Sequence, residues 1–160
     1  MKKISFGSLL LSVSYVLMGQ FTEPTEVPNG LNLTAFADVI AAKATSSSED
    51  WTFTVTIASP DKGCDQYADW WEILDTGGQL LYRRILMHSH VNEQPFSRSG
   101  GPVVVNPSQI VWIRAHMNNT GYGGNVLTGT IAEGFKPAPF PDKIGKDLEN
   151  VAPQPSGCNF

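Results

Sequence analysis

The three histidines of the chain are spaced in a way that could bind a metal ion. His88 and His90 are separated by one residue, and His116 closes a strongly alternating segment, residues 109–117. Residues i and i+2 of an extended chain project from one face, so the first two imidazoles would lie side by side. Neutral imidazole is a common ligand for zinc and copper. We therefore predict a transition-metal site, with copper and zinc both fitting, whose ligands are His88, His90, His116 and Glu93.

A purely structural role for the histidines is the alternative. A histidine pair at the end of a strand can hydrogen-bond the loop that follows it, and such short motifs often occur without a metal. The domain would then be a protein- or glycan-binding interaction module. A metal site requires the three imidazoles to converge on one water-accessible point, whereas a structural role requires them to be buried with carbonyl partners.

Two loops could form a recognition surface. Residues 93–99 (EQPFSRS) combine a charge pair, a proline and a phenylalanine, and residues 118–124 (NNTGYGG) are rich in glycine and asparagine. Loops on a rigid β-scaffold often carry recognition. The alternative is a packed loop, with the phenylalanine in the core and the arginine paired with Asp69 or Glu72. The candidate binding residues are Gln94, Phe96, Arg98 and Tyr122.

Two adjacent tryptophans, Trp70 and Trp71, lie in an aromatic segment, residues 67–74, together with Asp69 and Glu72. Alternation places the two indoles on opposite faces of a strand. One of them is expected in the core, because sandwiches often bury a tryptophan. The other could stack on a sugar ring beside the carboxylates, which adds a glycan to the candidate ligands.

The N-terminus indicates export. Lys2 and Lys3 precede residues 4–18, which carry no charge. This stretch is shorter than the roughly 20 residues of a transmembrane helix and matches a secretory signal peptide. We predict a signal peptide at 1–19, without a clear cleavage site, and a linker at 20–37. The protein would be periplasmic or extracellular, with no membrane span after cleavage.

The chain has two cysteines, Cys64 and Cys158, and neither belongs to a CxxC pair that would favour a metal. In an oxidising compartment, such a pair most simply forms a disulfide. The bridge would pin residues 136–160, a proline-rich segment without periodicity that we predict to be an irregular tail.

The remaining pattern predicts an all-β domain at 38–135. Residues 51–57 (WTFTVTI) alternate strictly between apolar and threonine, the signature of a half-buried strand. Residues 91–101 are expected to form a loop, and no amphipathic helical pattern follows the signal peptide. About seven short strands favour a single antiparallel, immunoglobulin-like β-sandwich. The predicted strands are 39–44, 51–57, 67–74, 79–87, 103–105, 109–117 and 126–131.

Composition and missing motifs exclude several functions. The net charge is −4, which argues against nucleic-acid binding. The chain has no G-x-S-x-G elbow and no glycine-rich loop that opens a helix, so nucleophilic and phosphate chemistry have no support. We therefore predict a protein that is not an enzyme.

Two segments of the chain resemble segments found in other proteins. HSHVNEQPFSRS (residues 88–99) and RAHMNNTGYGG (residues 114–124), together with Asp69-Trp70-Trp71-Glu72, resemble a group of exported bacterial proteins without a known activity. The similarity covers about residues 50–132. Some members carry a histidine where this chain has Thr120, so a metal that used it would lack that ligand here.

Overall fold

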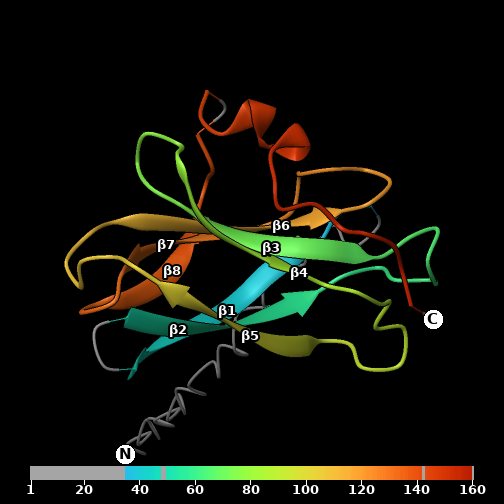
Figure 1. Cartoon of the computed structure of the whole chain (residues 1–160), viewed down its shortest axis with the longest axis horizontal. Coiled ribbons are helices and arrows are strands. Elements are labelled where there is room, and N and C mark those ends of the chain that lie inside the picture. Colours follow the sequence, from blue (N-terminus) through green and yellow to red (C-terminus); the bar gives the residue numbers. More distant parts are fainter. Residues whose placement is uncertain (1–34, 48–49, 142, 160) are drawn as a thin grey trace, which may run out of the picture.

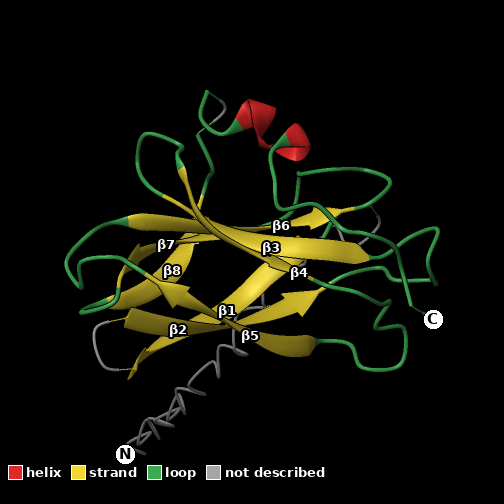
Figure 2. Cartoon of the chain, in the orientation of Figure 1, coloured by secondary structure: helices red, strands yellow, loops and turns green. Residues whose placement is uncertain are grey.

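The computed structural model describes residues 35–47, 50–141 and 143–159. They form two antiparallel β-sheets packed face to face, as Figures 1 and 2 show, so the predicted β-sandwich is confirmed. The immunoglobulin-like subtype stays a prediction. The predicted signal peptide and most of the predicted linker lie outside the described residues. Within the described ranges, no helix has the length and apolar character needed to cross a membrane.

The smaller sheet has the order β1-β2-β5 and the larger sheet the order β4-β3-β6-β7-β8. A short 3-10 helix, η1 (Lys146–Asn150), lies in residues 139–141 and 143–159, which we call the C-terminal segment. This segment, in red in Figure 1, passes over the larger sheet. The strands are β1 (Asp38–Ser47), β2 (Asp50–Ala58), β3 (Ala68–Leu74), β4 (Leu80–Ile85), β5 (Phe96–Val103), β6 (Val111–Met117), β7 (Val126–Thr130) and β8 (Gly134–Ala138).

The core lies between the two sheets. The apolar residues that alternate with threonines along β2 point into it. Phe53, Val55 and Ile57 are fully buried and belong to one apolar cluster with Trp71 and Ile73 of β3. The threonines of β2 project from the other face, as expected for a period of two residues. The predicted strand at 51–57 is therefore confirmed.

Strand β5 corrects the prediction of a loop at 91–101. Its sequence, FSRSGGPV, reads as a loop because glycine, proline and serine disfavour strands. Packing decides otherwise. Gly100 lies against Tyr82 and Trp71 so closely that a Cβ there would come within 3.0 Å of both rings. The hydroxyls of Ser97 and Ser99 also lie 2.8 Å from those of threonines on β2.

Strand β8 extends the sandwich beyond the predicted boundary at residue 135. It pairs with β7 at the edge of the larger sheet, where Pro137 needs no ladder donor. Phe135 of this strand packs on Phe53, with 5.7 Å between the ring centroids. The segment predicted to be irregular therefore begins as a strand and also contains η1.

Candidate functional site

The face of the larger sheet that points away from the core carries a cluster of polar and aromatic side chains. Trp70 lies opposite His116 across the β3–β6 pair, and Glu72 lies opposite Arg114. On the other side of β3, Glu72 also lies opposite Arg83 of β4. Directly opposed residues share one face of a sheet, so these five side chains gather into one group. We call it the outer-face cluster.

A buried carboxylate lies at the centre of the outer-face cluster. The side chain of Glu72 has no exposed surface, and each of its oxygens meets one arginine. Arg83 Nη2 lies 2.6 Å from Oε2, and Arg114 Nη2 lies 2.7 Å from Oε1. Both arginines also donate to Glu72 through Nε, so the carboxylate is held by two forked pairs.

The same arginines hold the C-terminal segment by its backbone. Arg83 donates to the carbonyl oxygens of Leu148, Val151 and Pro153. Arg114 Nη2 donates to the carbonyl oxygen of Gly145 over 2.7 Å. These bonds satisfy donors of guanidinium groups that would otherwise be costly to bury.

The disulfide between Cys64 and Cys158 fixes the end of the C-terminal segment, and the predicted pairing is confirmed. The two Cα atoms are 5.6 Å apart, and 94 positions of sequence separate the cysteines. Next to the bridge, the backbone N–H of Asn159 donates to the carbonyl oxygen of Met87 over 2.7 Å. The C-terminal segment is therefore attached to the sheet at both its middle and its end.

His116 forms a dyad with Asp69, with 2.7 Å between Nδ1 and Oδ1. The pairing of β3 with β6 shifts register between Ala68 and Trp70, so Asp69 is the extra residue of a bulge. The opposite ring nitrogen, Nε2, lies 3.9 Å from Oε1 of Glu149 in η1. Burial raises the pKa of Asp69, while the hydrogen bond and charge of His116 act in the lowering direction.

Two pockets lie between the sheet and the C-terminal segment. One has a volume of about 660 Å³ and is lined by Asp69, His116, the 118–121 loop and Gln154, among others. The other has a volume of about 550 Å³ and is lined by Arg114, Tyr122, Phe140, Ile144 and Lys146, among others. Glu149 lines both pockets, so they adjoin. We call the two pockets together the outer cleft.

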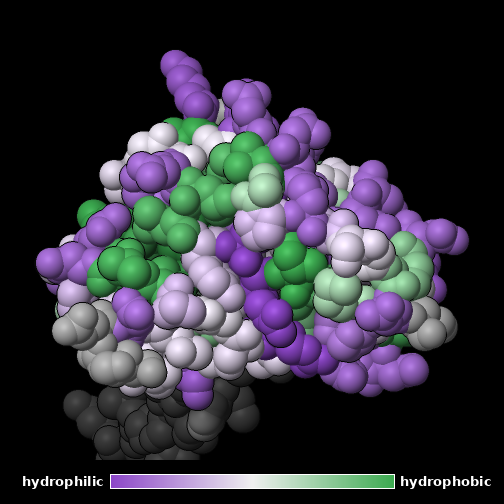
Figure 3. All heavy atoms as spheres, in the orientation of Figure 1, coloured by the Kyte–Doolittle hydropathy of each residue, from purple (hydrophilic) through white to green (hydrophobic). Residues whose placement is uncertain are grey.

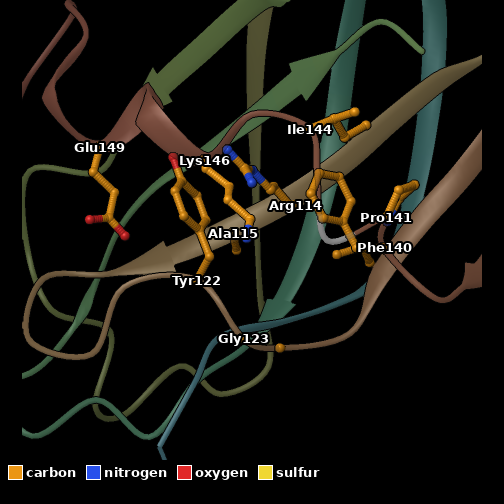
Figure 4. Close-up of a pocket in the computed structure, with 11 residues that line it drawn as sticks. Arg114, Ala115, Tyr122, Gly123, Phe140, Pro141, Ile144, Lys146 and Glu149 are labelled. Atoms are coloured by element: carbon orange, nitrogen blue, oxygen red, sulfur yellow. The ribbon is translucent and has the colours of Figure 1, made fainter. Parts of the chain in front are cut away.

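Aromatic rings and cations shape the second of these pockets, as Figure 4 shows. The guanidinium carbon of Arg114 lies 3.5 Å from the centroid of the Tyr122 ring and 4.9 Å from that of Phe140. Burial raises the pKa of the Tyr122 hydroxyl, which stays protonated and accepts a hydrogen bond from Trp70 Nε1 over 3.2 Å. The face of the molecule seen in Figure 3 carries apolar patches separated by a polar band.

His88 and His90 lie apart from His116. They line a cavity of about 130 Å³ that does not include His116 or the outer cleft. Across the described part of the chain, no group of three or more His, Cys, Asp or Glu side chains is arranged to hold a metal ion. The predicted site of four ligands is therefore not formed, because β6 places His116 beside Asp69 instead.

Three of the four predicted binding residues lie in the 93–99 loop and make contacts within the chain, and a role of this loop in recognition stays a prediction. Gln94 accepts a hydrogen bond from the Ser59 backbone and donates to the carbonyl oxygen of His90. Phe96 is buried, as the packed alternative predicted. Arg98 pairs with Glu93 over 2.7 Å, and not with Asp69 or Glu72. The fourth predicted residue, Tyr122, is the one that lines the outer cleft.

Neither tryptophan offers an open ring face. Trp71 is fully buried in the core, and Trp70 is 2% exposed. The indole of Trp70 stacks on His116 of β6 at 3.7 Å, and the Arg83 guanidinium of β4 lies 4.4 Å from its centroid. The prediction that one of the two stacks on a sugar is therefore wrong, because neighbouring strands supply the stacking partners.

Sequence reasoning missed the contribution of the C-terminal segment. Lys146, Glu149 and Phe140 line the outer cleft, but they lie in a stretch without periodicity. The arginines carried a usable signal, since a charged residue in the middle of an apolar strand needs a buried partner. Arg114 lies between Ile113 and Ala115 in this way.

Acid should destabilise the metal-free protein through His90. Burial, with the charges of Arg98 and His88, lowers its pKa to about 4 from an ordinary value of 6.5. The folded state therefore binds fewer protons than the unfolded state between these values, and stability falls as the pH drops from 6.5 towards 4. The loss amounts to about 3 kcal/mol. We expect His90→Phe, which keeps a ring against Phe96, to lose less stability over this range in urea titrations. Equal losses in both proteins would contradict the prediction.

Comparison with known proteins gives one relevant similarity. A protein of Halomicrobium mukohataei named "Putative lipoprotein" is 37% identical to this chain over 98 residues. The match covers 56% of this chain and 48% of the relative, so the chain matches about half the length of that protein. No family model and no solved structure matches the chain.

Proposed function

We propose that this chain is an exported, non-enzymatic binding module that takes an oligosaccharide in the outer cleft. Export is supported by the predicted signal peptide and by the name of the relative, which is that of a cell-envelope protein. The observation that carries the proposal is the pair of adjoining pockets that meet at Glu149. Their volumes, about 550 and 660 Å³, are those of small-ligand sites.

The lining of the outer cleft suits a sugar chain. The larger pocket presents carboxylate, imidazole and amide groups, which match the many donors and acceptors of hydroxyls. The smaller pocket presents the rings of Tyr122 and Phe140 with Pro141 and Ile144, which suit the apolar faces of sugar rings. A chain of several sugars would contact both kinds of surface.

The arrangement of the dyad supports binding rather than catalysis. The two nitrogens of His116 face Asp69 and Glu149, so the imidazole lies between the two carboxylates. A glycosidase needs an open space between its carboxylates for the scissile bond. Thr120 lines the same pocket as His116. Its hydroxyl donates a hydrogen bond to the carbonyl oxygen of Ala35 and not to the His116 imidazole.

Titration of the whole protein with cello-, manno- and chito-oligosaccharides of four to six sugars, followed by calorimetry, tests the proposal. We expect one of these series to bind, and Glu149→Ala to weaken that binding at least about tenfold, as the loss of one charged hydrogen bond would. Asp147→Ala is the matched control. It removes an exposed carboxylate from the same 3-10 helix, and Asp147 lines neither pocket.

Two outcomes would overturn the proposal. The first is that none of the three series binds the wild-type protein. The second is that Glu149→Ala and Asp147→Ala bind with equal affinity, which would place the sugar outside the outer cleft.

A further inference from the structure

His90 is a buried histidine with unused ring nitrogens. It is 2% exposed, and neither Nδ1 nor Nε2 has a hydrogen-bond partner among the described residues. A buried polar atom without a partner is costly, and buried groups of this kind are normally satisfied. Its ring is held in place by stacking on Phe96, with 3.7 Å between centroids. The position of the imidazole is therefore fixed, while its nitrogens remain available to a ligand.

A second imidazole lies next to it. The ring centroids of His88 and His90 are 4.4 Å apart, and both side chains line the cavity of about 130 Å³. His88 is exposed to solvent, which gives an entry path to the buried ring. Met87 lines the same cavity and could add a thioether sulfur. The volume of the cavity is large enough for one ion.

The surroundings of His90 favour a metal ligand over a proton acceptor. The imidazole is buried and neither of its nitrogens has a hydrogen-bond partner among the described residues, so one of them can bind a metal. Nδ1 faces Asp61, with 3.8 Å between Nδ1 and Oδ2. A carboxylate on this side orients a ligating histidine, because it favours the tautomer with a proton on Nδ1. Nε2 is then the nitrogen with a free lone pair.

We propose that His90 and His88 form a two-imidazole site for copper(I), with Met87 as a third, weaker ligand. Imidazole and thioether donors suit this soft ion. The site is separate from the outer cleft, so it does not depend on the proposed function.

The charges near the cavity favour a monovalent ion over zinc(II). Arg84 and Arg98 both line the cavity, and their positive charges would repel a divalent ion more strongly than a monovalent one. The pairing of Arg98 with Glu93 over 2.7 Å reduces the repulsion from that arginine. Structural zinc sites also take four ligands, and the cavity offers three donor side chains.

Competition with bicinchoninate tests the site. The whole protein is titrated with copper(I) under ascorbate and without oxygen, and the absorbance of the copper–bicinchoninate complex reports transfer. We expect the wild-type protein to take up one equivalent. His88→Ala and His90→Phe should each weaken the apparent affinity at least tenfold. Asn92→Ala, an exposed neighbour that does not line the cavity, is the control and should bind as the wild type does.

The affinity of a variant is informative only when that variant is folded. Circular dichroism and thermal unfolding establish this, and His88→Ala keeps the test valid if His90→Phe does not fold. Failure of the wild type to compete, or wild-type affinity in folded His88→Ala, would overturn the proposal. Loss of binding in His116→Gln alone would also overturn it, because the ion would then lie in the outer cleft.

Discussion

Replacement of Glu72 by glutamine is expected to lower the free energy of unfolding by about 3 to 5 kcal/mol. The carboxylate has no exposed surface and neutralises two arginines that are themselves buried. An amide of nearly the same shape removes the negative charge but leaves both guanidinium groups away from water. The cost therefore comes mainly from two buried positive charges that lose their partner. Chemical denaturation of the wild type and the variant, followed by tryptophan fluorescence, measures the difference.

Glu93→Gln provides the matched control for this prediction. Glu93 also pairs with an arginine over 2.7 Å, but its side chain is 57% exposed and that of Arg98 is 28% exposed. Exposed ion pairs contribute about 0 to 1 kcal/mol, so this variant should unfold almost as the wild type does. Similar losses in the two variants would show that burial is not the source of the effect.

Removal of the disulfide is the other change with a large expected effect. The double variant Cys64→Ala, Cys158→Ala should lose about 4 to 5 kcal/mol of unfolding free energy. The bridge joins residues 94 positions apart, and such a cross-link greatly restricts the unfolded chain. Urea titration of the oxidised wild type and of the double variant measures this loss.

A reducing agent gives the control for the cross-link. The wild type with its disulfide reduced should approach the stability of the double variant, and the double variant should not respond to the reductant. An unchanged unfolding midpoint in the double variant would mean that the arginine–carbonyl contacts hold the C-terminal segment without the bridge.

Strands in which apolar and polar residues alternate could be predicted from the sequence. Strands rich in glycine and proline could not. In residues 51–57 the buried face can be identified from the sequence, because apolar residues alternate with threonines. The turn at residues 75–78 lies between the predicted strands 67–74 and 79–87, and the carbonyl oxygen of Asp75 closes it by accepting a hydrogen bond from the backbone N–H of Gly78. Strand β5 was not predicted because its glycine, Gly100, is required by the close approach of the Tyr82 and Trp71 rings. That requirement comes from residues distant in sequence, so local propensity points the other way.

The candidate site was predictable in its residue types but not in its grouping. The disulfide followed from the number of cysteines and the inferred compartment. The sequence predicted His116 to be a metal ligand beside His88 and His90, but in the structure its partner is Asp69. A bulge in β3 brings Asp69 to it, and a one-residue irregularity of this kind leaves no trace in the period of the sequence. Lys146 and Glu149 line the outer cleft only because the C-terminal segment passes over the larger sheet. The sequence of this segment has no periodic pattern from which that path could be predicted.

The way in which Arg83 and Arg114 hold the C-terminal segment has a consequence for diversification. Their hydrogen bonds go to main-chain oxygens, which every residue possesses. Ile144, Lys146 and Glu149 can therefore be exchanged without loss of the attachment, although they form one wall of the outer cleft. Substitutions at these positions would change the shape and charge of the outer cleft, while the β-sandwich that carries it stays the same.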